Sequence, residues 1–146
     1  MFKEEMTILL VEDDPGHARL IEKNLRRSKI SNKIVILNDG QKAVDYLFGG
    51  GHYETSDRSE SLLMLLDLNL PVLDGYQVLV RMKGDERTKR IPVIILTTTD
   101  DSEEAAKCYE LGCNIYINKP VDYEKFSESI QKLGLFLSIV TIPGGK

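Results

Sequence analysis

Short, mostly apolar runs recur along the chain, and each is followed by polar or small residues. The runs lie at positions 8–11, 34–37, 62–66, 93–96 and 115–118. Such runs, bounded by turn residues, are typical of strands that are buried on both faces of a sheet. Between them, apolar residues recur at spacings of three and four, as in amphipathic helices. This alternation predicts an α/β fold with a doubly wound parallel sheet.

Capping residues mark the expected helix boundaries. Asp14 precedes Pro15, a pair typical of a helix N-cap followed by the first helical residue. Asp101 or Ser102 can cap a fourth helix that ends at Gly112, and a fifth is expected to begin near Asp122. The buried stripes of four of these helices are predicted to contain Ala18, Ile21 and Leu25; Ala43, Tyr46, Leu47 and Phe48; Tyr76, Val78, Leu79 and Met82; and Phe126, Ile130, Leu133 and Leu137.

Length and composition indicate one globular domain. The chain has 146 residues, 42% hydrophobic and 29% charged, enough to bury roughly 70% of its unfolded surface. We expect a single domain over 1–146, with a core at about 6–138, a tail at 139–146 and no effector domain. The net charge of −4 argues against a nucleic-acid partner. Cys108 and Cys113 form no metal or disulfide pattern, and we expect a cytoplasmic protein without membrane insertion.

Polar side chains follow four of the five runs. Because the carboxyl ends of parallel strands meet at one edge of the sheet, these side chains should converge although they are far apart in the sequence. Carboxylates follow the first and third runs, hydroxyls follow the fourth and an ammonium follows the fifth. They are Glu12 and Asp13, Asp67, Thr97 and Thr98, and Lys119.

This combination of groups predicts phosphoryl chemistry that depends on a metal ion. Three carboxylates at one place repel one another unless a cation lies between them, and Mg²⁺ prefers such oxygen ligands. A carboxylate such as Asp67 can attack a phosphoryl group and form an acyl phosphate. The phosphoryl oxygens then need cations and donors, which Mg²⁺, Lys119 and the Thr97 hydroxyl can provide.

The motifs at these strand ends resemble the motif set of response-regulator receiver domains. They are V-E-D-D at 11–14, L-D-L-N-L-P at 66–71 with D-G at 74–75, L-T-T at 96–98 and N-K-P at 118–120, and the match spans residues 6–138. The resemblance implies a flavodoxin-like, three-layer fold with five helices and strand order 2-1-3-4-5. It implies these roles: Asp67 as the phosphorylated residue, Asp13 as a direct Mg²⁺ ligand, Glu12 as a ligand through water, the Asn69 carbonyl as a further ligand, Lys119 as the phosphate-binding lysine, Thr97 as the switch hydroxyl and Tyr116 as the switch aromatic.

The resemblance also implies a function. The chain is expected to be a stand-alone response regulator that is phosphorylated by a sensor histidine kinase and is a signalling switch, not an enzyme. Phosphorylation would change the face formed by the fourth helix, fifth strand and fifth helix. The alternative is a phosphorelay intermediate that passes the phosphoryl group to a histidine phosphotransfer protein. The bulky Thr98, and Thr99 without a carboxylate or amide, predict a phosphorylated state that lasts at least minutes.

Two further segments and one histidine carry weaker predictions. Leu135, Ile139 and Ile142 form a second apolar stripe, which predicts a homodimer through the C-terminal region unless the tail folds back. The loop at 49–61 is expected to be irregular. This loop, the segment at 91–98 and the ending at 140–143 resemble the corresponding segments of stand-alone regulators that are paired with phytochrome-type histidine kinases. For His17, close to the pocket, we favour a surface role.

Overall fold

The computed structural model describes residues 6–49, 61–98, 101–119 and 123–139. The predicted loop at 50–60, Thr99 and the tail beyond 139 therefore lie outside the described residues. Strands and helices alternate along the chain, as the sequence predicts. The strands are β1 (Thr7–Val11), β2 (Ile34–Leu37), β3 (Leu62–Leu66), β4 (Val93–Thr97) and β5 (Ile115–Asn118), and the helices are α1 (Pro15–Arg27), α2 (Gly40–Phe48), α3 (Gly75–Lys83), α4 (Ser102–Leu111) and α5 (Tyr123–Ile139).

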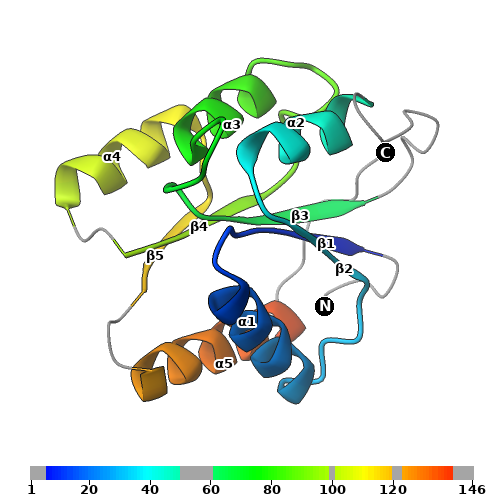
Figure 1. The fold of residues 1–146 in the computed structure, drawn as a ribbon, viewed down its shortest axis with the longest axis vertical. Helices are drawn as coiled ribbons and strands as arrows, with labels where there is room; N and C mark the ends of the chain where they lie inside the picture. Colours follow the sequence, from blue (N-terminus) through cyan, green and yellow to red (C-terminus); the bar gives the residue numbers. More distant parts are fainter. Residues whose placement is uncertain (1–5, 50–60, 99–100, 120–122, 140–146) are drawn as a thin grey trace.

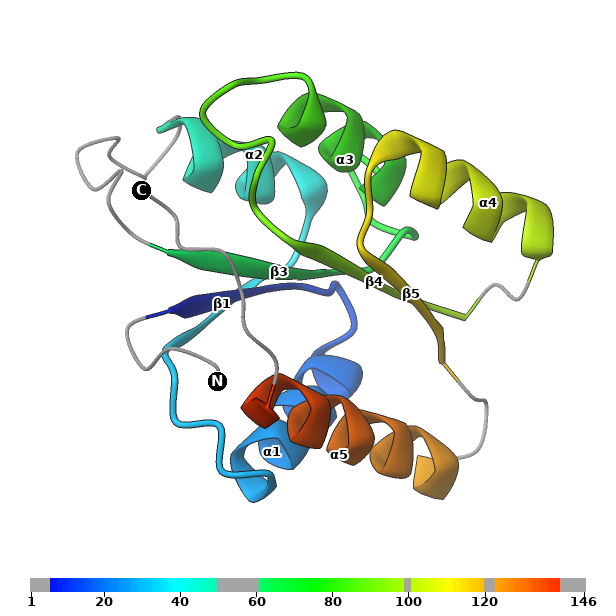
Figure 2. The ribbon, with the colours of Figure 1, turned by 180° about the vertical axis from the view of Figure 1, so that it is seen from behind.

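The strands form one parallel sheet in the order β2-β1-β3-β4-β5, which confirms the predicted topology. Helices α1 and α5 cover one face, and α2, α3 and α4 cover the other (Figures 1 and 2). None of the helices in the described ranges is long and apolar enough to span a membrane.

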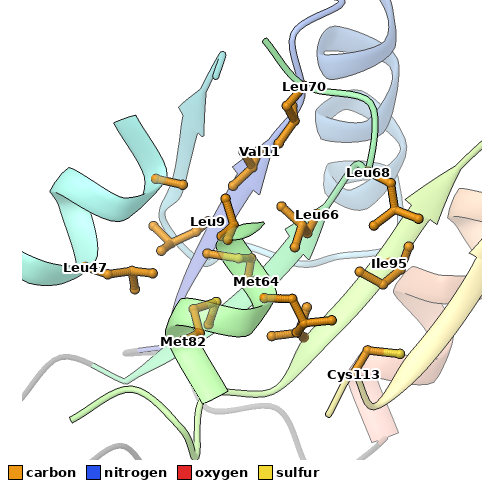
Figure 3. Close-up of a cluster of buried hydrophobic side chains, with 14 of the residues drawn as sticks. Leu9, Val11, Leu47, Met64, Leu66, Leu68, Leu70, Met82, Ile95 and Cys113 are labelled. Carbon is orange, nitrogen blue, oxygen red and sulfur yellow. The ribbon is translucent and has the colours of Figure 1, made fainter. Parts of the chain in front are cut away.

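Alternate apolar residues of the central strands β1, β3 and β4 enter two separate hydrophobic cores. Ile8 and Leu10 of β1 pack toward α1 and α5, with the predicted stripe of α5. Leu9 and Val11 pack on the opposite side, among residues of α2, α3 and α4 (Figure 3). Because both faces of the central strands are covered, their sequences are apolar without alternation.

An aspartate caps each of the first four helices. Asp14 caps α1 and Asp101 caps α4, as predicted, and Asp39 and Asp74 cap α2 and α3. Gly112 ends α4 in the left-handed region, with φ of 112°. Aspartate is a strong N-cap because its side chain accepts hydrogen bonds from exposed amides of the first turn. Three of these caps follow strands directly or within a few residues, so they fix where the helices leave the sheet.

Main-chain hydrogen bonds extend the sheet just past the strand ends. Glu12 N donates to Leu37 O (3.0 Å), Asp67 N donates to Val11 O (3.1 Å), and Lys119 N donates to Thr97 O (2.6 Å). Each of these three polar residues is thereby anchored to the end of a neighbouring strand. Their side chains project from a rigid edge, and not from free loops.

The turn after Asp67 depends on the absence of a side chain at Gly75. Gly75 N donates to Leu68 O at 2.9 Å. A Cβ atom on Gly75 would lie 2.4 Å from the carbonyl oxygen of Asp67 and 2.6 Å from Leu68 Cα. Helix α3 therefore approaches the backbone of Asp67 as closely as only glycine permits.

We expect Gly75→Ala to destabilise the domain by roughly 1–3 kcal/mol, because the added methyl group must displace backbone atoms. Gly84→Ala, at the other end of α3, is the matched control. Its φ is −90° and the nearest atom to an added Cβ is Val80 O at 3.2 Å, a less severe approach than at Gly75, so its effect should be clearly smaller. Denaturant unfolding of both variants tests this, and equal effects would contradict the close approach.

Candidate functional site

The ammonium group of Lys119 lies at the centre of the pocket between two buried carboxylates. Its Nζ donates to Glu12 Oε1 and, at 3.1 Å, to Asp67 Oδ2. The side chains of Lys119 and Glu12 are each only 2% exposed. Burying charges is costly unless they are paired and hydrogen-bonded, and these contacts meet that condition. The structure thus brings together the groups that the sequence placed at the ends of β1, β3 and β5.

The second oxygen of each carboxylate is held by the main chain. Asp14 N donates to Glu12 Oε2 at 3.2 Å, and Asn69 N donates to Asp67 Oδ1 at 3.1 Å. Both carboxylates are therefore fixed at two points. An arrangement held in this way needs little reorganisation when a ligand arrives.

Three carboxylates lie close enough together to share one cation. Oxygen atoms of Glu12, Asp13 and Asp67 all lie within 4.8 Å of one another. Asp13 is exposed, whereas Glu12 and Asp67 are buried, so the cluster opens to solvent on the side of Asp13. Such a set of oxygen donors fits Mg²⁺ or Mn²⁺ better than the softer metals that prefer nitrogen or sulfur. Asn69 is exposed and lies beside Asp67, because its backbone N donates to the Asp67 carboxylate.

The pKa of Glu12 shows that the Lys119 ammonium does not fully offset the cost of burying the negative charge of this carboxylate. The pKa of Glu12 is raised to about 7, chiefly by burial and to a smaller extent by the neighbouring Asp67, although the contacts with Lys119 act to lower it. The charged form of Glu12 is thus disfavoured near neutral pH although Lys119 is in contact. A further cation would relieve this penalty.

Thr97 has a buried hydroxyl at the end of β4. The side chain is fully buried, and within the described ranges no group accepts from or donates to its Oγ1. A buried hydroxyl without a partner costs about 1–3 kcal/mol, so it calls for an explanation. The neighbouring Thr98 is exposed. The Thr97 hydroxyl is therefore available to donate a hydrogen bond to a ligand at the edge of the sheet where the carboxylates lie.

Tyr116 is tied to α4 by a contact that the sequence did not indicate. Its hydroxyl donates to Glu104 Oε1 at 3.1 Å, and its backbone N donates to the Tyr109 hydroxyl at 3.0 Å. Burial, followed by the hydrogen bond to Glu104, raises the pKa of Tyr116, and the same two causes raise the pKa of Tyr76 on α3. Glu104 thus interacts with tyrosines from two other elements. The half-buried Tyr116 couples β5 to α4.

His17 is closer to the pocket than the favoured surface role suggests. Its Nδ1 lies 3.4 Å from Lys119 Nζ, and its side chain is 38% exposed. Phe126, predicted only as a core residue, lies with its ring centroid 5.9 Å from the same Nζ. The only sequence signal for His17 is its position three residues after the cap Asp14, which places it in the first turn of α1.

The raised pKa of Glu12 gives a testable pH dependence. Between its usual value of 4.5 and about 7, the folded chain retains a proton on Glu12 that the unfolded chain has lost. In the presence of EDTA, the stability that this protonated carboxyl contributes is fully present below pH 4.5 and is lost as pH rises to about 7. Over this range the free energy of unfolding should fall by at most about 1.4 kcal/mol per pH unit. Glu12→Gln should lack this component. Unfolding titrations of both chains from pH 5 to 8 should diverge, and parallel curves would contradict the assignment.

Comparison with known proteins agrees with this geometry. The model of the response regulator receiver domain matches residues 8–131. Response regulator Rcp1 of Synechocystis is 40% identical over 137 residues, which cover 93% of this chain and 92% of Rcp1. A solved structure of the Mn²⁺-bound form of response regulator Rcp1 has a TM-score of 0.87 at 38% identity, with 95% of this chain and 99% of that chain covered.

Two further solved structures are similar over nearly their whole length. A receiver domain from Rhodospirillum rubrum has a TM-score of 0.90 at 48% identity, with 97% of this chain and 99% of that chain covered. The phosphorylated cyanobacterial phytochrome response regulator RcpA has a TM-score of 0.86 at 36% identity, with coverage of 96% and 99%. Together with the acidic pocket, these matches show that the chain belongs to the response regulator receiver domain family and is a response regulator of two-component signalling.

Proposed function

We propose that this chain is a stand-alone response regulator that accepts a phosphoryl group on Asp67 from a sensor histidine kinase, with Mg²⁺ bound beside it. The observation that carries the proposal is the convergence of Glu12, Asp13 and Asp67 around the ammonium of Lys119. Receiver domains accept phosphoryl groups from histidine kinases and bind a divalent metal at an acidic pocket, and this cluster has the composition that such chemistry needs.

Each residue has a role in the proposed transfer. A carboxylate oxygen of Asp67 forms a bond to phosphorus as the bond from phosphorus to the donor's nitrogen or oxygen breaks, and the leaving group takes that electron pair. Lys119 Nζ and the Thr97 hydroxyl would then donate to the phosphoryl oxygens. Mg²⁺, held by Asp13, Asp67 and the Asn69 carbonyl and by Glu12 through water, would neutralise charge on the phosphoryl group.

The proposed switch follows from the unused hydroxyl of Thr97. Movement of Thr97 toward a phosphoryl oxygen would leave space beside β5, into which Tyr116 can shift. The hydrogen bond between Tyr116 and Glu104 links such a shift to α4. Phosphorylation adds about −1.5 to −2 charge and three acceptor oxygens, enough to bias a face with two packing arrangements. We propose that the face formed by α4, β5 and α5 changes in this way.

Thr98, exposed just after the end of β4, would limit access to the phosphoryl group and slow its hydrolysis.

Self-association is the output that we favour over a phosphorelay role. Leu135 of α5 is 60% exposed, whereas Leu133 and Leu137 on the other side of the helix are buried. An exposed leucine on this helix supports the predicted homodimer contact through the C-terminal region or the face formed by α4, β5 and α5. The similarity to phytochrome response regulators supports a phytochrome-type kinase as the phosphodonor partner. On this proposal the chain is a cytoplasmic signalling switch consisting of one domain.

Incubation with Mg²⁺ and acetyl phosphate tests the proposal. We expect wild type to gain one phosphoryl group by intact mass, and Asp67→Asn to gain none because its amide is not a nucleophile. Asp45→Asn is the matched control. It makes the same chemical change on helix α2, which carries none of the pocket residues, and should behave as wild type. A shift of elution volume that accompanies the mass gain would identify self-association as the output. Equal phosphorylation of wild type and Asp67→Asn would exclude Asp67 as the acceptor.

A further inference from the structure

The ammonium of Lys119 has two neighbours that are not carboxylates. The Nδ1 atom of His17 lies 3.4 Å from Nζ, within the range of a long hydrogen bond. The ring centroid of Phe126 lies 5.9 Å from Nζ, at the outer limit of a cation–π contact. The two rings also touch, edge to face, with centroids 5.4 Å apart and planes at 77°. Lys119 therefore lies between two carboxylates, Glu12 and Asp67, on one side and two aromatic rings, His17 and Phe126, on the other.

The two sets differ in what else they must bind. An ammonium has three N–H donors. Among the described residues, the acceptors around Lys119 Nζ are Glu12 Oε1, Asp67 Oδ2 and His17 Nδ1. On the proposed function, both carboxylates are also needed by the metal ion and the phosphoryl group. The imidazole and the phenyl ring have no such second task. They can keep contact with the ammonium while its carboxylate partners change.

We propose that His17, supported by Phe126, is a positioning residue that keeps the Lys119 ammonium directed into the pocket when Glu12 and Asp67 are engaged elsewhere. The proposal rests on the proposed function of the pocket. In this role His17 acts as a neutral imidazole that accepts at Nδ1 and carries its proton on Nε2. A protonated ring could not accept from Lys119 and would instead face Asp14 Oδ2, 3.9 Å from Nδ1.

Both supporting rings come from elements that pack firmly together. The backbone N of His17 donates to the cap oxygen of Asp14 at 3.1 Å, which fixes the first turn of α1. Phe126 is buried in α5. Helices α1 and α5 are joined by a hydrogen bond from Gln131 Nε2 to the buried Asn24 Oδ1 at 3.0 Å. The His17 ring is thus held by the Asp14 cap and the packing of α1, and the Phe126 ring by α5, so neither ring depends on the turn that carries Asp67.

A double-mutant cycle with Lys119 tests this role. His17→Leu keeps a side chain of moderate size but removes the acceptor. We expect the initial rate of phosphorylation by acetyl phosphate to fall roughly tenfold, the lower end for the loss of one hydrogen bond to a charged group. In a Lys119→Met background, His17→Leu should change the rate little, because there is no ammonium left to position. His17→Gln, which offers an amide oxygen as acceptor, should recover part of the lost rate. Thermal unfolding of each variant checks that the chain remains folded.

Metal affinity provides a readout that does not depend on phosphorylation. No contact joins His17 to Glu12, Asp13 or Asp67 among the interactions of the described residues, so Mn²⁺ affinity measured by electron paramagnetic resonance should be nearly equal in wild type and His17→Leu. A rate loss of the same size in both Lys119 backgrounds, an unchanged rate, or a parallel loss of Mn²⁺ affinity would overturn the positioning role. A wild-type chain that gains no phosphoryl group would overturn this role and the proposed function together. Normal phosphorylation of wild type with an unaffected His17→Leu would overturn the positioning role alone.

Discussion

One buried ammonium between two buried carboxylates is the interaction around which the pocket is organised. Lys119, Glu12 and Asp67 come from the ends of three strands, and all three side chains are buried. Removing one partner of a buried ion pair typically costs about 3–5 kcal/mol, because the remaining charge is left without compensation. The main-chain bonds that continue the sheet at these residues hold the charges in place, and the glycine that starts α3 lets that helix approach Asp67. The fold thus provides the rigidity that the charges require.

The same interaction makes the pocket responsive. Lys119 contacts two of the three clustered carboxylates, and the raised pKa of Glu12 reflects above all its burial, which the contacts with Lys119 offset only in part. On the proposed function, a divalent cation or a phosphoryl group would change which oxygen atoms Lys119 contacts. Thr97 and Tyr116 lie on the neighbouring strands, and Tyr116 is bonded to Glu104 on α4. A rearrangement at the centre of the pocket therefore has a physical route to the outer surface of the domain through a few polar contacts.

The sequence predicted the fold and the location of the site better than it predicted the contacts within the site. The alternation of strands and helices and caps such as Asp14 follow from local rules of periodicity and capping, so they could be predicted from the residues alone. The strand order was implied only by the resemblance to receiver domains. The convergence of Glu12, Asp67 and Lys119 follows from the topology, because parallel strands end at one edge. Glu104 could not be connected to Tyr116, since nothing in the spacing of α4 indicates which of its carboxylates faces β5.

Val72 and His17 illustrate two other limits. Val72 has a positive φ of 69° and is 73% exposed, a conformation that is unfavourable for a β-branched residue. No propensity predicts it. The neighbouring Pro71 O accepts a hydrogen bond from Gly40 N at 3.3 Å, a contact between distant segments that the local sequence does not indicate either. His17 is a polar residue in the first turn of a helix, where most side chains face solvent. Its place beside Lys119 depends on how α1 and α5 pack against the sheet, which only the tertiary structure reveals.

The free energy of unfolding of Lys119→Met, measured at pH 8 with and without Mg²⁺ and compared with wild type, tests the central role of the ammonium most directly. If Lys119 is the counter-ion of Glu12 and Asp67, the variant should be less stable than wild type in EDTA by about 3–5 kcal/mol. Mg²⁺ should then stabilise the variant more than wild type, because the ion replaces a missing positive charge there and competes with an existing one in wild type. Equal stabilisation of both chains by Mg²⁺, or a variant as stable as wild type in EDTA, would contradict this account of the pocket.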